Sequence, residues 1–131
     1  MSTIFSKIIE GEIPCYKIAE TEDLFAFLDI NPVQKGHTLV VPKREVNDFF
    51  DLSDEELASM MSFSKKIAAA IKKVSGCVKV SVSVIGLEVP HAHMHLIPIW
   101  NEKDLDFTSE REELTEEEQK EIQEAIISYL D

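Results

Sequence analysis

The sequence predicts an α+β domain built on an antiparallel sheet. Five segments have the composition or alternation of β-strands, two longer segments have the periodicity of amphipathic helices, and short turns join most of the strands. Strands joined in this way, with the helices set apart from them, are typical of an antiparallel sheet with helices packed against it. At 131 residues the chain has the length of one domain, which we expect to span residues 1–131.

The N-terminal segments predict a short helix followed by three strands. The short apolar run Ile4–Ile9 precedes a glycine and a proline, which would end a helix. The segments "CYKIA" (15–19) and "LFAFLDI" (24–30) are rich in apolar and aromatic residues, and the turn "TED" separates them, so they predict a hairpin. A third strand is expected at His37–Pro42.

The middle of the chain predicts a long helix followed by a half-buried strand. Ser53 and Glu56 form a capping-box signature, apolar residues then recur at helical spacing, and Gly76 suits the helix end. The segment Val78–Gly86 alternates strictly, so its valines are expected to share one buried face: Val80, Val82 and Val84.

The last predicted elements are a fifth strand and a C-terminal helix. The segment "HAHMHLIPI" (91–99) alternates over its whole length. Thr115 and Glu118 form a second capping pair in front of an amphipathic segment.

The charge is concentrated near the C-terminus. Of the net charge of −12, residues 101–131 contribute −9, with 12 acidic and 3 basic residues. We therefore divide the domain into a core (1–100) and an acidic helical extension (101–131). This balance argues against sequence-independent binding to nucleic acid or to an anionic membrane, because both need basic patches.

The sequence also predicts a cytoplasmic protein. No apolar run approaches the roughly 20 residues of a membrane span. The start "MSTIFSKIIEGEIP" lacks the features of a signal peptide. Cys15 and Cys77 stand alone and belong to no metal-binding or redox motif, which suits reduced thiols.

Three of the four histidines stand at alternate positions, at His91, His93 and His95. In a strand they would form a row about 13 Å long on one face, while the residues between them pack on the other. One interpretation is a metal site, in which two neighbouring rings share an ion with a third ligand such as His37, Glu88 or a cysteine. The other is covalent catalysis, because a neutral imidazole can attack phosphorus and form a phosphoramidate that water later hydrolyses.

The pattern "HAHMHLIP" resembles the signature of the histidine triad (HIT) superfamily. The segments "IFSKIIEGEIP" and "AFLDINPVQKGHTLVVPK" also stand in that family's order and spacing, so the resemblance covers roughly residues 3–98. The chain is most similar to the Hint branch of nucleotide-binding hydrolases. The resemblance implies cleavage of a nucleoside phosphoramidate, or of a related bond at the α-phosphate of a purine nucleotide, without a cofactor. It also implies a homodimer whose sheet continues across the two chains.

The resemblance also implies roles for individual residues. His93 would be the nucleophile, His95 would contact the phosphoryl oxygens, His91 would orient His93, and His37 would complete the cluster. The carboxylate of Asp29 would accept hydrogen bonds from the ribose hydroxyls. The remaining implied nucleotide-binding residues form an apolar slot for the base or border the nucleotide: Phe5, Ile8, Phe27, Ile30, Leu39, Glu88 and Val89.

Three departures from the family pattern affect these expectations. In the Hint branch the C-terminal region can shape substrate choice across the dimer, whereas here it is a long acidic helix, Glu116 to Leu130, without a known motif. Before the triad, "GLEVP" places Leu87 and Glu88 where relatives have a polar amide and a small hydroxyl residue. Glu88 could therefore bind an amine leaving group, or the chain could be a nucleotide-binding module with little or no catalysis. In addition, Thr3, Ser6 and Glu45 occupy positions where some bacterial relatives bind zinc with two cysteines and a histidine. We therefore expect no metal.

Overall fold

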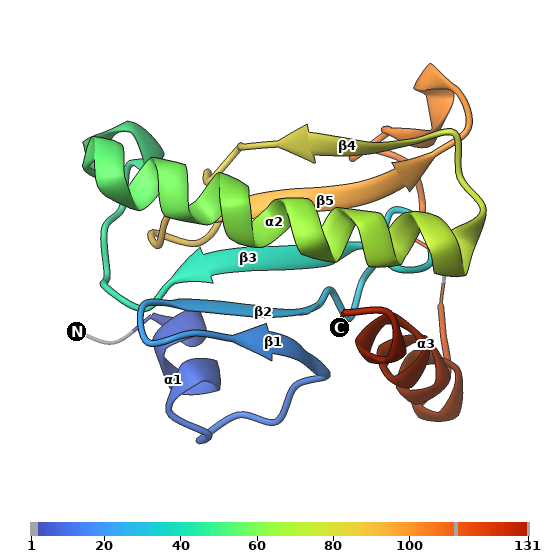
Figure 1. The fold of residues 1–131 in the computed structure, drawn as a ribbon, viewed down its shortest axis with the longest axis horizontal. Coiled ribbons are helices and arrows are strands. Elements are labelled where there is room, and N and C mark those ends of the chain that lie inside the picture. The colour runs from blue at the N-terminus through green and yellow to red at the C-terminus, as the bar shows by residue number, and fades with distance from the viewer. Residues whose placement is uncertain (1–2, 112, 131) are drawn as a thin grey trace.

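The computed structural model describes residues 3–111 and 113–130. Its strands form one antiparallel sheet in the order β1-β2-β3-β5-β4 (Figure 1), which confirms the predicted five-stranded sheet. The helices and strands are α1 (Ile4–Ile9), β1 (Lys17–Glu20), β2 (Leu24–Leu28), β3 (Thr38–Pro42), α2 (Asp54–Ser75), β4 (Lys79–Ser83), β5 (Met94–Ile99) and α3 (Glu116–Ser128).

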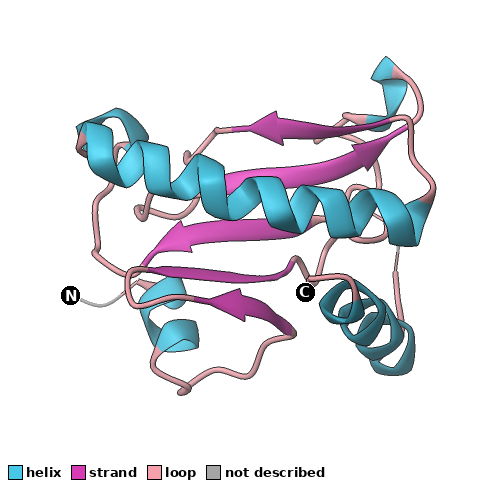
Figure 2. Ribbon diagram, in the orientation of Figure 1, coloured by secondary structure: helices cyan, strands magenta, loops and turns pink. Residues whose placement is uncertain are grey.

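The long helix α2 forms where the sequence predicts it. The Ser53 side chain accepts from the Glu56 backbone N–H, and the Glu56 carboxylate accepts from the Ser53 N–H, so the capping box is complete. Gly76 ends the helix with a φ of 69°, a left-handed conformation that favours glycine. The helix crosses one face of the sheet (Figure 2).

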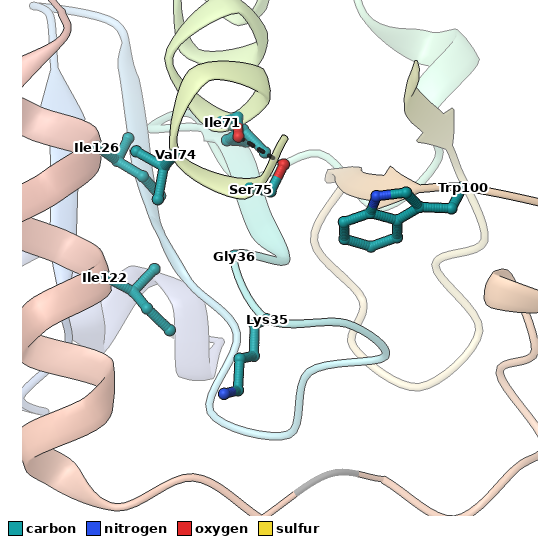
Figure 3. A pocket seen from close by; sticks show the side chains of 8 residues that line it. All are labelled: Lys35, Gly36, Ile71, Val74, Ser75, Trp100, Ile122 and Ile126. Carbon is teal, nitrogen blue, oxygen red and sulfur yellow. Dashed lines mark hydrogen bonds between the residues drawn. The ribbon is translucent and has the colours of Figure 1, made fainter. Parts of the chain in front are cut away.

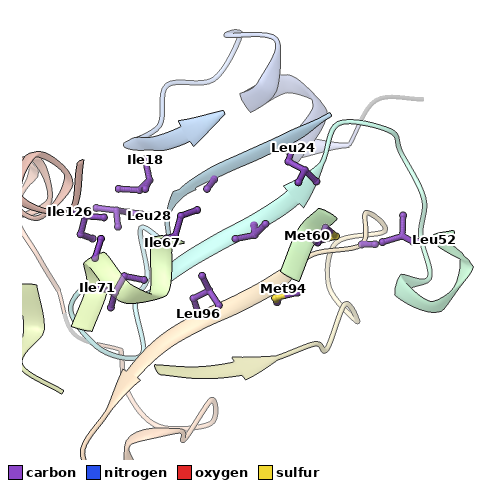
Figure 4. Close-up of a cluster of buried hydrophobic side chains, with 14 residues drawn as sticks. Ile18, Leu24, Leu28, Leu52, Met60, Ile67, Ile71, Met94, Leu96 and Ile126 are labelled. Atoms are coloured by element: carbon purple, nitrogen blue, oxygen red, sulfur yellow. The ribbon is translucent and has the colours of Figure 1, made fainter. Parts of the chain in front are cut away.

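The two faces of the sheet have different roles. On one face, α2 and α3 bury the main core, in which Met94 and Leu96 of β5 meet Met60, Ile67 and Ile71 of α2 (Figure 4). A second apolar cluster contains Phe5 of α1, Phe25 and Phe27 of β2, and Leu39 and Val41 of β3. Because strand side chains alternate between faces, His95, which lies between Met94 and Leu96, points to the face that carries this second cluster.

The predicted bounds of β5 and β4 are wrong. β5 begins at Met94, so His91 and His93 lie in an extended segment before the strand, where the Ala92 N–H donates to the Val46 carbonyl oxygen. β4 ends at Ser83, and Val82 and Val84 are 49% and 41% exposed. The sequence pattern overestimates the burial of these valines. β4 lies at the edge of the sheet, and the alternation of a strand does not reveal whether another element covers its side chains.

None of the helices among residues 3–111 and 113–130 combines the length and the apolarity needed to cross a bilayer.

Candidate active site

The four histidines meet on the sheet face opposite α2. His37 directly precedes β3, His95 lies in β5 and pairs with Leu39, and His91 and His93 lie in the segment that leads into β5. The ring centroids of His93 and His95 are 5.0 Å apart, and those of His37 and His95 are 5.1 Å apart. All four side chains are buried, and only His93 and His95, at 6% and 8% exposure, retain more than 1%.

The protonation of the His93 ring follows from its hydrogen bond. His93 Nδ1 lies 2.7 Å from the backbone carbonyl oxygen of His91. A carbonyl oxygen only accepts, so Nδ1 carries the proton and the neutral ring keeps its lone pair on Nε2. Every buried side-chain nitrogen or oxygen of the described residues has a partner, and His93 Nε2 has none, so this nitrogen reaches solvent. Its lone pair is therefore open to a molecule that binds from solvent.

A second chain of hydrogen bonds fixes the ring of His95. The Val33 N–H donates to His37 Nδ1 at 3.0 Å, so the neutral His37 ring carries its proton on Nε2. That N–H donates to His95 Nδ1 at 2.9 Å. The His95 proton is therefore on Nε2, where it can donate to an oxygen outside the ring. His93 and His95 thus offer a lone pair and an N–H side by side.

His91 has a structural connection to the N-terminus. Its Nε2–H donates to the Pro42 carbonyl oxygen at 2.7 Å, and the Thr3 hydroxyl lies 2.7 Å from its Nδ1. The Thr3 backbone N–H and the Ser6 hydroxyl both donate to the Glu45 carboxylate. The structure therefore holds the His91 ring, and through the His91 carbonyl it holds His93.

Three of these residues occupy the positions at which some bacterial relatives bind zinc. Thr3, Ser6 and Glu45 lie together beside His91, as the resemblance predicts for the zinc-binding positions, but they form a hydrogen-bonded network. Two hydroxyls and a carboxylate do not fit a structural zinc site, which uses thiolates and imidazoles. The absence of zinc remains a prediction, and a stoichiometric zinc signal in purified, untagged protein would contradict it.

Another group of residues has metal-ligand spacing. Donor atoms of Asp29, His37 and His95 all lie within 4.8 Å of one another. A metal ion there would have to replace the hydrogen bond between His37 Nε2 and His95 Nδ1. Because that bond satisfies both nitrogens without an ion, the geometry favours the hydrogen-bonded pair.

The electrostatic surroundings keep the imidazoles neutral. Burial lowers the pKa of His93, and burial together with the nearby His93 and Arg111 lowers the pKa of His95 to about 4. Burial and the same kinds of neighbours lower the pKa of His37 to about 3. In its neutral form His93 keeps a lone pair on Nε2, and His95 carries its single proton on Nε2.

Asp29 lies at the edge of the cluster, with its Oδ2 3.6 Å from His37 Nε2. Its Oδ1 accepts from the Asn31 N–H at 2.8 Å. Burial raises its pKa, Arg111 opposes this rise, and Glu88 adds to it.

The predicted base-binding residues gather around Phe5. Its ring packs edge-on against His93 at 4.9 Å and against Phe27 at 5.7 Å. Phe5, Phe27 and Leu39 are buried in the second apolar cluster, and Ile8 and Val89 pack against it. Ile30, by contrast, is 70% exposed beside Asp29.

A hollow of about 300 Å³ opens next to His93. It is lined by Ala92 and by residues 47–50 and 84–87, and the predicted base-binding side chains are not among its lining residues. The space beside His93 is thus separate from the Phe5 cluster.

Sequence reasoning missed two residues near the cluster. The Phe107 ring lies 5.2 Å from that of His95 and 6.3 Å from that of His37, edge-on to both. The Arg111 guanidinium lies 5.6 Å from the Phe107 ring centroid and donates to the Asn31 carbonyl oxygen at 2.8 Å. The available signal was an aromatic residue and an arginine close together in an otherwise acidic segment, but nothing in the sequence indicated where that segment folds.

Comparison with protein families identifies this arrangement. The HIT domain family matches residues 10–101, which include His37 and all three triad histidines. The chain belongs to the HIT family. In this chain one of these histidines directly precedes β3, two lie in the segment that leads into β5, and one lies in β5.

Individual HIT proteins agree in sequence and fold. An adenosine 5′-monophosphoramidase of Schizosaccharomyces pombe is 44% identical over 104 residues, which cover 79% of this chain and 78% of the relative. A zinc-bound histidine triad family protein of Mycobacterium smegmatis superposes with a TM-score of 0.85 at 29% identity, covering 99% of this chain and 94% of the other. A hypothetical histidine triad nucleotide-binding protein of Sulfolobus tokodaii superposes with a TM-score of 0.80 at 27% identity, covering 96% of this chain and 90% of the other.

Proposed function

We propose that this HIT protein binds a purine nucleotide and cleaves a nucleoside phosphoramidate, or a related bond at the α-phosphate, through a nucleotidylated His93. The observation that carries the proposal is the pair of oriented rings: a free Nε2 lone pair on His93 beside a free Nε2–H on His95. The name of the S. pombe relative supports phosphoramidate cleavage, and the name of the S. tokodaii relative supports nucleotide binding.

The reaction would proceed in two displacements. The His93 Nε2 lone pair forms a bond to phosphorus, and the bond to the leaving amine breaks with its electron pair on the amine, which takes a proton. Water then forms a P–O bond, releases His93 and loses a proton. His95 Nε2–H donates to a phosphoryl oxygen in both steps, where negative charge develops.

The surroundings supply the remaining functions. The Phe5 cluster would take the base, with Ile8, Phe27, Leu39 and Val89, and an ionised Asp29 would accept from the ribose hydroxyls next to Ile30. The hollow beside His93 offers space for the leaving group.

A homodimer is part of this proposal. β4 has no neighbour on its outer side among the strands of the described residues, and it exposes Val82, with Val84 and Ile85 following it. A second copy that paired with β4 would cover these side chains and continue the sheet. Sedimentation equilibrium tests this directly: a dimer is expected, and a monomer at micromolar concentration would contradict it.

The rival function is a nucleotide-binding regulatory or interaction module with weak or no catalysis, which the altered segment "GLEVP" favours. The discriminating experiment measures AMP binding by calorimetry and turnover of a purine nucleoside 5′-phosphoramidate on the same preparation. Binding together with turnover supports the hydrolase. Binding without any turnover supports the module and contradicts the hydrolase.

Glu88 is proposed to favour cationic leaving groups. Its carboxylate would attract a leaving group that, like lysine, carries a positive charge away from the nitrogen bonded to phosphorus. Glu88→Gln should therefore lower the preference for a lysine-type over a neutral alkylamine leaving group by about 2–5-fold, the range of an exposed ion pair. The preference is measured as the ratio of the two kcat/KM values. Glu22→Gln, in the turn between β1 and β2, is the matched control. An unchanged ratio in Glu88→Gln would contradict this role.

The low pKa values of the histidines predict an unusual pH profile. Because His93 and His95 stay neutral below the ordinary histidine pKa of about 6.5, kcat/KM should remain constant from about pH 8 to below pH 6.5 and fall only at lower pH. Initial rates in buffers of constant ionic strength measure this. An acid limb with an apparent pKa of 6.5 or higher would contradict it.

The lowered pKa values of His37 and His95 also make the free energy of unfolding depend on pH. In the unfolded chain these histidines take up protons near pH 6.5, whereas in the folded protein His95 does so at about 4 and His37 at about 3. Between these limits the unfolded state binds more protons, so the free energy of unfolding should fall as the pH is lowered from about 6.5 to 4. Urea unfolding at several pH values tests the sign.

A further inference from the structure

The C-terminal extension contacts the active-site loop at three points. Gln34 Nε2 donates to the Asp104 carbonyl oxygen at 3.2 Å. Arg111 Nη1 donates to the Asn31 carbonyl oxygen at 2.8 Å, and Gln119 Nε2 donates to the Asp29 carbonyl oxygen at 3.0 Å. The residues from the extension lie beyond position 101, where the match to the HIT domain family ends.

The loop held in this way, residues 29–34, carries two parts of the site. Asp29 is the proposed ribose ligand, and the Val33 N–H fixes the His37 ring, which in turn fixes the proton of His95. A displacement of this loop would therefore change both the ribose contact and the donor that faces the phosphate.

The extension is itself fixed to the core. Ile126 of α3 is fully buried in the main core, and Gln123 Nε2 donates to the Lys17 carbonyl oxygen at 2.8 Å. Where α3 and the end of α2 meet Lys35 and Gly36, a hollow of about 270 Å³ remains, with Trp100 on its wall (Figure 3). The segment between Trp100 and α3 thus runs past the histidines between two anchored ends.

Two side chains of this segment face the cluster. Phe107 packs edge-on against His95 and His37, and so covers the histidine pair from outside the sheet. Arg111 is joined to the Phe107 carbonyl oxygen at 3.2 Å and is near enough to Asp29, His37 and His95 to lower the pKa of all three. Because its guanidinium lies 5.6 Å from the ring of Phe107, which itself packs against His95, Arg111 brings a cation to the side of the cluster where we propose that the phosphate binds.

We propose that the extension completes the nucleotide site within the same chain, with Arg111 as a positioning residue that holds loop 29–34 and attracts the phosphate, and Phe107 as a cover over His37 and His95. This inference rests on the proposed function. It gives the acidic segment a role in binding the nucleotide.

The test compares the binding of AMP and of uncharged adenosine to the full-length protein. Arg111→Gln should weaken AMP binding about tenfold, which corresponds to about 1.4 kcal/mol. Adenosine should lose much less, because it lacks the phosphate charge. Arg111→Lys should restore part of the AMP affinity, since it keeps the charge but not the planar fork of the guanidinium. Lys120→Gln, an exposed charge on α3, is the matched control.

A second comparison tests Phe107. Phe107→Ala should admit water to His95 and shift the acid limb of kcat/KM to higher pH, while the neutral His37 and His93 rings and the Arg111 cation remain beside it. Tyr129→Ala, which removes a half-exposed aromatic ring at the far end of the extension, should leave the limb unchanged. Thermal unfolding of each variant separates these effects from loss of the fold.

The outcomes are distinguishable. If the native protein neither binds AMP nor turns over a phosphoramidate, the proposed function fails. If the native protein does both, and the folded Arg111→Gln and Phe107→Ala variants behave like their controls, the role of the extension is overturned. A selective loss of AMP affinity and a shifted acid limb support it.

Discussion

Replacing His93 with alanine is expected to reduce turnover of a purine nucleoside 5′-phosphoramidate by at least ~10³-fold, the scale seen when a nucleophile is removed. His93 offers the free Nε2 lone pair. The neighbouring His95 cannot replace it, because the Nε2 of His95 carries a proton. The other contacts that we propose for the nucleotide would persist, so AMP binding should change only a few fold. Turnover and calorimetric binding are measured on the same samples.

Two controls sharpen this experiment. His93→Gly leaves space for a free imidazole, which should restore part of the activity if only the ring nitrogen is missing. His91→Ala should lower activity less, because it removes the ring that orients the segment and leaves the attacking atom in place. Undiminished turnover in His93→Ala would contradict the assignment of the nucleophile.

A large effect on stability is expected at Ile126. Its side chain is fully buried in the main core, whereas the adjacent Ile127 is 42% exposed. Ile126→Ala should lower the free energy of unfolding by about 2–5 kcal/mol, the range for large-to-small core substitutions. Ile127→Ala should change it by no more than about 0.5–1 kcal/mol.

Denaturant unfolding of this pair tests whether the extension belongs to the cooperative unit. The two substitutions remove the same atoms from neighbouring positions of α3, so helix propensity changes equally in both. Equal, small effects would indicate that α3 does not contribute to the folded core. A large effect confined to Ile126 would support a single folding unit.

The sequence predicts most of the fold because its signals are local. The capping residues Ser53 and Thr115 begin α2 and α3, and Gly76 ends α2, as expected. The strand edges are less predictable. His91 and His93 continue the alternation of β5, yet the N–H between them bonds to Val46, a partner that periodicity does not reveal.

The candidate site is predictable only in part for the same reason. The triad and His37 follow from motif order, and the structure brings them together. Phe107 and Arg111 reach the cluster only because α3 packs against α2 and β1 from the far end of the chain. Such long-range packing leaves no short pattern in the sequence.

The charge pattern illustrates a further limit. The extension is strongly acidic, a pattern typical of a solvated helix, and most carboxylates of its described residues are exposed. The residues that connect it to the site are a buried Gln119, a partly buried aromatic ring and one of its few cations. Net charge therefore describes its surface and says little about its contacts.

The central claim is that His93 carries the nucleotide during turnover. The most direct measurement is rapid mixing with a purine nucleoside 5′-phosphoramidate, an alkaline quench that preserves phosphoramidate bonds, and mass spectrometry of the intact and digested protein. The account predicts a mass increase of one nucleoside monophosphate, located on His93 and absent from His93→Ala. Full turnover with no adduct, or with the adduct on another residue, would contradict it.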